Sequence, residues 1–199
     1  MSRGMAWLVW LGLVAAIFWA PETDPNVWDW IYRVASGQIA GENAWAVAHF
    51  SLMGLWPLLM LALFDEQLFD RPFPGLPFVL GSMMLGCYVL LPWLGMRVPP
   101  TTRPVQSTLG WVVGSTAWVM VFGALGTALI VWAMVSGGFD AWATRCQTEG
   151  FFFLMGLDFV AFWLVSLGEA RHQAPTRGGR WWLTLLPFVG LVLYLRERA

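Results

Sequence analysis

The chain has 199 residues, of which 58% are hydrophobic and only 12% are charged, and its net charge at pH 7 is −1. Soluble domains carry about 25% charged residues, so this composition excludes an ordinary soluble domain, and the near-neutral charge gives no basis for binding nucleic acid. All basic residues are arginines, which excludes a Schiff-base lysine and a retinal bound through one. We therefore predict an all-α, polytopic integral membrane protein whose partner is the lipid bilayer.

Six apolar runs predict six transmembrane helices in a single membrane domain over residues 1–199. The expected spans are residues 5–20, 44–64, 75–96, 112–136, 150–168 and 181–195. After the first run, apolar residues recur at helical spacing within a polar stretch, which predicts a short interfacial helix over about residues 25–37. The first run is short, and both an anchor and a cleaved signal peptide remain open. Pro21 after Trp19-Ala20 favours the anchor.

Arginine positions do not predict an orientation for this six-span arrangement. Five arginines fall on one side and six on the other, so the positive-inside rule is silent. The five are Arg3, Arg71, Arg145, Arg196 and Arg198, and the six are Arg33, Arg97, Arg103, Arg171, Arg177 and Arg180. The chain also has 15 tryptophans, many at the ends of apolar runs, which predicts aromatic belts at the membrane surfaces.

Asp158 is the one acidic residue in the interior of an apolar run. A carboxylate near the centre of a bilayer costs roughly 2.5–3.5 kcal/mol on insertion scales, so a partner, a ligand, water or a proton must offset that cost. Three interpretations remain open. Asp158 pairs with His49 or with an arginine folded inward, it is protonated and hydrogen-bonded, or it lines a pathway for protons or a polar substrate.

His49 and Glu149 are the other candidate binding or proton-relay residues. His49 lies inside the second run, where it is a candidate ligand to a chlorophyll magnesium, a proton relay, or a histidine bonded to a neighbouring helix. His172 is expected in a loop, so a haem with two histidine ligands lacks its second ligand. Glu149 precedes the Asp158 helix, where it complements the helix dipole. It lies about 13.5 Å from Asp158 along a helix, too far to share a proton.

The sequence shows no catalytic constellation and no metal-ligand spacing, so we predict no catalytic and no metal-binding residues apart from the possible chlorophyll ligand. Close-packing glycines and abundant aromatic residues favour lateral association with proteins or ring-shaped lipophiles.

Two resemblances follow from the last third of the chain. Asp158-Phe159, then Glu169-Ala170-Arg171, then residues 190–198 resemble the C-terminal part of small uncharacterised multi-spanning membrane proteins of cyanobacteria and plastids. This resemblance implies a photosynthetic membrane. Residues 149–153 resemble the latter half of the Pro-x-Glu-Glu-x-x-Phe-Phe motif of membrane lycopene cyclases, with Cys146 and Thr148 in place of its proline and first acid.

The function we predict is that of a non-enzymatic accessory membrane protein. It associates with a larger membrane complex or binds a lipophilic pigment or quinone, with chlorophyll, carotenoid and quinone as the candidate cofactors. One alternative is a small proton-coupled transporter using Asp158 and His49. The other is an integral-membrane enzyme of isoprenoid or carotenoid metabolism. The predicted location is a bacterial inner membrane or a thylakoid.

Overall fold

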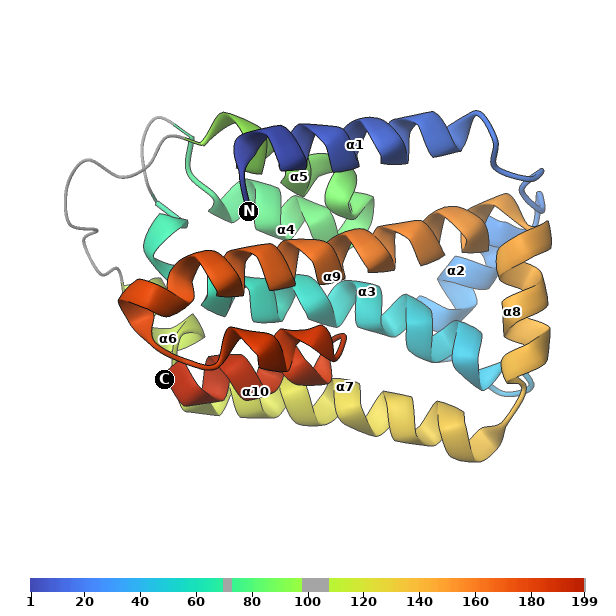
Figure 1. Cartoon of the computed structure of the whole chain (residues 1–199). Helices are drawn as coiled ribbons and strands as arrows, with labels where there is room; N and C mark the ends of the chain where they lie inside the picture. The colour runs from blue at the N-terminus through green and yellow to red at the C-terminus, as the bar shows by residue number, and fades with distance from the viewer. Residues whose placement is uncertain (70–72, 98–107, 199) are drawn as a thin grey trace.

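The computed structural model of the chain describes residues 1–69, 73–97 and 108–198, and within them it contains helices and no strands (Figure 1). The helices in chain order are α1 Arg3–Ile17, α2 Val27–Ala35, α3 Ala44–Leu63, η1 Asp65–Gln67, α4 Leu76–Leu85, α5 Cys87–Met96, α6 Thr108–Val113, α7 Thr116–Ser136, α8 Phe139–Thr148, α9 Gly150–Arg177, η2 Trp181–Leu185 and α10 Val189–Arg198. The predicted all-α fold class is confirmed.

Three helices of the described chain, α3, α7 and α9, are long and apolar enough to cross a membrane. They correspond to the second, fourth and fifth expected spans. Two of them begin at a polar N-cap, where Asn43 accepts a hydrogen bond from the backbone of Ala46 and Ser115 accepts one from Trp118. Such caps satisfy backbone N–H groups that have no partner inside the helix. The prediction of six spans is not confirmed.

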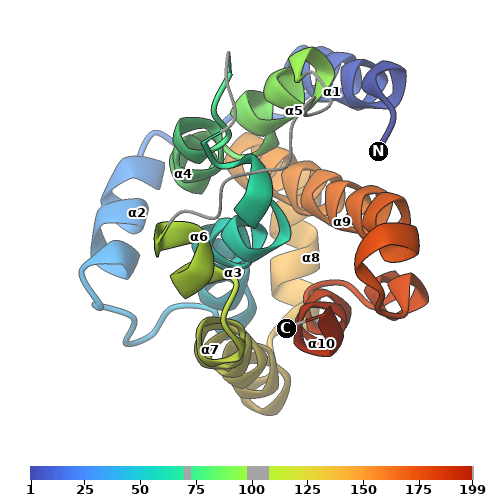
Figure 2. The same ribbon diagram turned by 90° about the vertical axis from the view of Figure 1, so that its left-hand side faces the viewer.

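α3 is the central helix of the bundle, with α4, α7, α9 and α10 around it (Figure 2). Its Trp56 is fully buried, and the indole donates a hydrogen bond to Ser166 Oγ on α9 at 2.9 Å. On another side, the Trp118 indole of α7 donates to the Leu58 carbonyl of α3 at 2.8 Å. Indole N–H groups inside an apolar core require such partners, so these bonds fix how α7 and α9 sit on α3.

The expected third span, residues 75–96, is corrected to a hairpin of two antiparallel helices, α4 and α5. Gly75 at the start of α4 lies against the Trp93 ring near the end of α5, and Gly81 lies beside Val89 closer to the turn. The turn residue, Gly86, has φ 60° and ψ −152°, a backbone region that is essentially restricted to glycine. The chain therefore reverses at Gly86 instead of continuing, and both helices reach only part of the way along the bundle (Figure 1).

The expected sixth span, residues 181–195, is also a hairpin, formed by η2 and α10. At its open end, the Arg180 backbone N–H donates to Glu197 Oε2 at 3.0 Å. Hydrogen bonds from Arg180 also hold the pKa of Glu197 below its usual range. At the turn, Phe188 has φ 55°, and it is the one non-glycine residue of the described chain with a positive φ. Its ring is buried 5.6 Å from the Trp56 ring, and this packing offsets the backbone strain.

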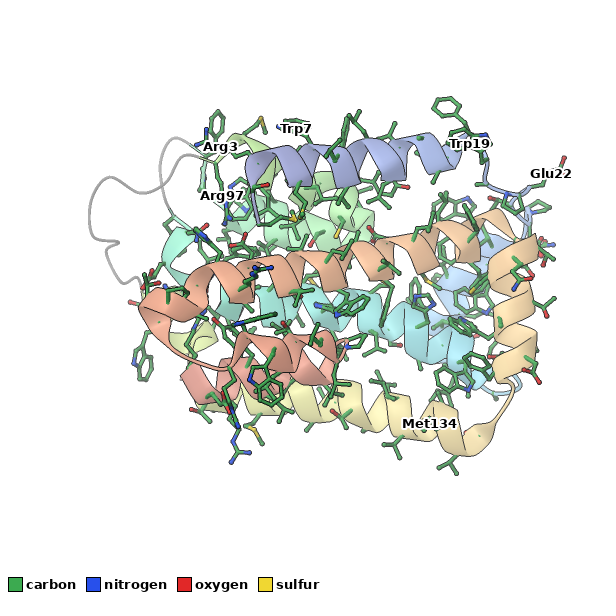
Figure 3. The ribbon with its side chains drawn as sticks, viewed as in Figure 1. Arg3, Trp7, Trp19, Glu22, Arg97 and Met134 are labelled. Carbon is green, nitrogen blue, oxygen red and sulfur yellow. The ribbon has the colours of Figure 1, made fainter. Side chains whose placement is uncertain are left out.

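Both hairpins start and finish at the end of the bundle that carries the two chain termini, which we call the terminal end. α2 and α8 lie at the opposite end, which we call the α8 end (Figure 1). Figure 3 shows Arg3 and Arg97 at the terminal end and Glu22 at the α8 end. The expected division of arginines between the two membrane sides is therefore wrong, because two of the expected spans are hairpins that return to the same end. The misplaced residues are Arg97, Arg145, Arg171, Arg177 and Arg180. Arg71 and Arg103 lie outside the described residues.

Buried ion pairs tie the terminal end together. Glu169 of α9 is fully buried and pairs with Arg97, at the end of the α4–α5 hairpin, and with the N-terminal ammonium at 2.7 Å. Arg198, at the end of the η2–α10 hairpin, donates to the Ala62 carbonyl at 2.6 Å and pairs with Asp65 at 3.2 Å. Each hairpin is thus anchored by an arginine at its C-terminal end.

α2 is amphipathic, as the sequence predicts for this segment. Val27, Trp30 and Val34 face the bundle and are buried, whereas Trp28 and Tyr32 on the other face are exposed. The Trp30 indole donates to Glu42 Oε2 at 2.8 Å, in the turn before α3. This bond orders the connection at the α8 end.

Candidate functional site

The site is built around Asp158, in the first third of α9. Asp158 is 4% exposed, and its Oδ1 accepts a hydrogen bond of 2.7 Å from the backbone N–H of Cys87, the first residue of α5. In a continuous helix this N–H would bond the carbonyl four residues earlier, that of Met83. Asp158 thus caps the N-terminus of α5 by accepting a hydrogen bond from its first backbone N–H.

Gly86 is needed for this contact as well as for the turn. A Cβ at position 86 would overlap both oxygens of the Asp158 carboxylate. The absence of a side chain lets the hairpin tip lie directly on the acid. The first turn of α5 is further fixed by α1, because the Tyr88 hydroxyl donates to the Leu13 carbonyl at 3.1 Å and the Trp10 indole donates to the Tyr88 carbonyl at 3.0 Å.

A cavity of about 570 Å³ lies beside the hairpin tip, with Asp158 in its wall. Most of its surface is apolar. The lining residues come from the end of α2, the middle of α3, the α4–α5 turn and the first half of α9: Val34, Ala35, Phe50, Ser51, Met53, Gly54, Ser82, Met83, Met84, Leu85, Gly86, Tyr88, Phe151, Leu154, Met155 and Asp158. Met84 is 91% exposed and Leu85 is 62% exposed. The mouth of the cavity therefore lies on the outer face of the bundle, at the hairpin tip.

His49 does not meet Asp158. No ion pair joins them in the described chain, and His49 is not among the residues that line the Asp158 cavity. Its Nδ1 accepts a hydrogen bond from the Trp142 indole at 3.3 Å, and its ring packs edge-on against Phe159 at 5.1 Å. Because Nδ1 is the acceptor, the neutral ring carries its hydrogen on Nε2. Nε2 is buried and has no hydrogen-bond partner.

Glu149 lies at the α8 end, between α8 and α9. It occupies the N-cap position of α9, but its side chain makes no capping bond there. Instead both carboxylate oxygens accept hydrogen bonds from Arg145, at 2.8 and 3.1 Å. The pair lines a small polar pocket of about 160 Å³ that shares no residue with the Asp158 cavity. The structure therefore keeps Glu149 and Asp158 in separate sites.

His172, which the sequence placed in a loop, lies in α9, because that helix continues to Arg177. It is exposed and lies outside the apolar part of the helix. Trp93, near the end of the third expected span, does not contribute to an aromatic belt, because it is 1% exposed and its indole donates to the Phe73 carbonyl at 3.0 Å. Within the described residues, no group of three or more His, Cys, Asp or Glu side chains is arranged to hold a metal ion.

Comparison of the chain with protein-family models, with curated proteins and with solved structures found no match. Function is therefore inferred from the site.

Sequence reasoning identified Asp158 but missed the groups that surround it. The helix break at Gly86 and the backbone N–H of Cys87 create the site, and Ser82 and Tyr88 add polar groups to its wall. One signal was available: Gly86 lies in the middle of an apolar run and is followed by Pro92, and both residues weaken a continuous helix.

Proposed function

We propose that this chain is an integral membrane protein that binds a lipophilic small molecule in the Asp158 cavity. The observation that carries this proposal is a largely apolar cavity of about 570 Å³ with one carboxylate in its wall. Small-molecule sites are typically about 300–1,000 Å³, mostly apolar, with a few polar groups that orient the ligand. The accessory role predicted from the sequence is here narrowed to ligand binding.

The proposed membrane arrangement has four crossings, made by α1, α3, α7 and α9, and two hairpins that enter from the terminal end and return to it. α2 and α8 then lie along the opposite membrane surface. Asp158 lies about 12 Å along α9 from Gly150, which is well inside a hydrocarbon layer about 30 Å thick. In this arrangement the cavity mouth at Met84 faces acyl chains, so the ligand enters from the lipid phase.

An enzyme of isoprenoid metabolism fits this cavity less well. Catalysis by proton transfer requires positioned acid and base groups, and Asp158 and Tyr88 are the titratable side chains in the wall. The Tyr88 hydroxyl donates its hydrogen to α1. Location in a photosynthetic membrane and association with a larger complex stay predictions from the sequence.

A small proton-coupled carrier is the second candidate, and the α4–α5 hairpin favours it. Carriers often bind their substrates where a helix is interrupted near the middle of the membrane, and Gly86 is such an interruption beside an acid. Proteoliposomes that accumulate a lipophile in response to a proton gradient, but not with Asp158→Asn, would establish transport. Equal accumulation by both proteins would remove this candidate.

Filling the cavity at Gly54 tests the binding proposal. Gly54 lies inside α3 and lines the cavity, and a Cβ there meets no atom within 4 Å. We expect Gly54→Leu to lower the content of co-purifying lipophile at least about tenfold, because the side chain occupies ligand space. The variant should be no less stable than the parent, since leucine favours a helix interior by about 1 kcal/mol over glycine. Solvent extraction and mass spectrometry of the protein purified in mild detergent measure the ligand.

Gly156→Leu is the matched control. Gly156 lies inside α9, also has open space around its Cβ position, and does not line the cavity. It should retain the ligand content of the parent protein. Equal ligand content in all three proteins, at matched thermal stability, would contradict the proposal.

A further inference from the structure

The carboxylate of Asp158 has no counter-charge in the structure. It makes no ion pair with any residue of the described chain, and neither an arginine nor a histidine lines the cavity. The other buried acid, Glu169, pairs with Arg97, and the partly exposed Asp65 pairs with Arg177 and Arg198. An isolated buried carboxylate is costly unless it is paired or neutralised.

The two helix dipoles that meet at the hairpin tip do not neutralise this charge. The N-terminus of α5 contributes about half a positive charge beside Asp158, but the C-terminus of α4 contributes about half a negative charge at the same turn. The two contributions roughly cancel, since Gly86 alone separates the helices. The negative charge at this point of the cavity is therefore close to that of the carboxylate itself.

The polar groups around Asp158 also offer acceptors and few donors. The Cys87 N–H and thiol both donate to Asp158. The Ser82 hydroxyl donates to the Val79 carbonyl at 2.6 Å, and the Tyr88 hydroxyl donates to α1. Met83, Met84 and Leu85 form the last turn of α4. Backbone carbonyls in the last turn of a helix lack hydrogen-bond partners inside that helix. These three residues line the cavity. A ligand group that donates hydrogen bonds matches this wall.

The apolar part of the cavity is suited to a large, soft cation. Phe50 and Phe151 present aromatic rings, and Met53, Met83 and Met155 present thioethers. Aromatic faces attract organic cations, and the polarizable, flexible methionine side chain adapts to ligands of irregular shape.

From this geometry we infer that the ligand of the Asp158 cavity is a lipophilic organic cation, with its ammonium group at Asp158 and its apolar body toward Met84. This inference rests on the proposed function, because it names the class of molecule that occupies the same cavity. A quinone presents carbonyl acceptors, and a hydrocarbon carotene presents no polar group. With either molecule bound, the carboxylate would have to be neutralised by a proton instead of by a counter-charge.

Three probes with one carbon skeleton test the inference. They are 1-adamantylammonium, neutral 1-adamantanol and anionic adamantane-1-carboxylate, titrated into the full-length protein in lipid nanodiscs, with empty nanodiscs subtracted. We expect the cation to bind most tightly and the anion not to bind. Asp158→Asn keeps an acceptor for the Cys87 N–H but removes the charge. It should weaken cation binding about 10- to 100-fold, as expected for loss of a charged partner, and leave binding of the alcohol unchanged.

The other outcomes separate the two proposals. If the alcohol binds as tightly as the cation, and Asp158→Asn changes neither, the cation assignment is overturned while the cavity remains a lipophile site. If Gly54→Leu leaves binding of all probes unchanged, the cavity is not the binding site and the proposed function fails as well. If Asp158→Asn does not fold, the ranking of the three probes on the parent protein still decides the inference, because equal affinities overturn it.

Discussion

At the scale of single residues, the contact between Asp158 and Gly86 explains how an acid is accommodated inside an apolar helix. The acid is partnered by backbone, through the Cys87 N–H at 2.7 Å, and not by another side chain of opposite charge. This contact leaves the charge free to face a cavity. Asp158 and Gly86 therefore hold the hairpin tip in place, and both also line the cavity.

Gly86→Ala should be strongly destabilising. Its backbone conformation is essentially accessible to glycine alone, and the added methyl group would overlap the Asp158 carboxylate. We expect a loss of about 2–4 kcal/mol in unfolding free energy, from backbone strain and overpacking together. Thermal or denaturant unfolding in detergent measures the loss.

Gly156→Ala provides the comparison for this substitution. Gly156 has helical backbone and open space at its Cβ position, so alanine should be neutral or slightly stabilising there. Similar unfolding curves for Gly86→Ala and Gly156→Ala would show that the hairpin tip does not lie on Asp158 as described.

The sequence located Asp158 correctly as an acid inside an apolar helix, and the residue is buried, but the sequence did not identify its partner. The reason is physical. Hydropathy reveals that residue 158 lies in an apolar helix, whereas its partner is a backbone N–H 71 positions away, and backbone groups leave no trace in residue type. His49 was the expected partner, because it is the histidine inside an apolar run. Its ring instead accepts a hydrogen bond from the Trp142 indole.

At the scale of elements, the two hairpins are what apolar periodicity could not predict. A run of about 20 apolar residues fits one spanning helix or two half-length helices equally well. In residues 75–96 the choice is made by Gly86, and in residues 181–198 it is made at Phe188, whose ring fills the space beside Trp56 and Gly126. Long uninterrupted runs, by contrast, predicted α3 and α7 well, to within a few residues.

The anchors of the hairpins were missed for a related reason. The fifth expected span ends at residue 168, just before Glu169, but α9 continues to Arg177. Glu169 is therefore held inside the bundle, where it meets Arg97 from a distant part of the chain. Removing one partner of such a buried ion pair lowers the stability of a protein by several kcal/mol. These pairs therefore help to keep each short hairpin in place.

At the scale of the whole molecule, the charges divide unequally between the two ends. Within the described residues the terminal end carries Arg3, Arg97, Arg171, Arg177, Arg180, Arg196 and Arg198, against Asp65, Glu66, Glu169 and Glu197. The α8 end carries Arg33 and Arg145, against Glu22, Asp24, Asp29, Glu42, Asp140 and Glu149. The apparent balance of the six-span arrangement disappears once the hairpins are recognised.

This asymmetry predicts that the terminal end faces the cytoplasm, by the positive-inside rule. Expressed in a bacterial inner membrane, the chain with a fluorescent protein at its C-terminus should fluoresce, because that reporter folds in the cytoplasm. Alkaline phosphatase inserted near Gly41, in the exposed turn before α3, should be active outside the cytoplasm. The opposite pattern would reverse the orientation, and cytoplasmic signals from both positions would contradict the crossing that we propose for α1.

Photolabelling can show whether the Asp158 cavity binds a lipophilic cation. The probe is a lipophilic primary ammonium that carries a diazirine, applied to the protein in nanodiscs with and without an excess of unlabelled 1-adamantylammonium. We expect labelling of Met83, Met84 and Met155, which line the cavity. The competitor should abolish this labelling, and Gly54→Leu should lack it. Labelling that is spread over the exposed faces of α1 and α7, and that neither the competitor nor Gly54→Leu reduces, would contradict the proposal.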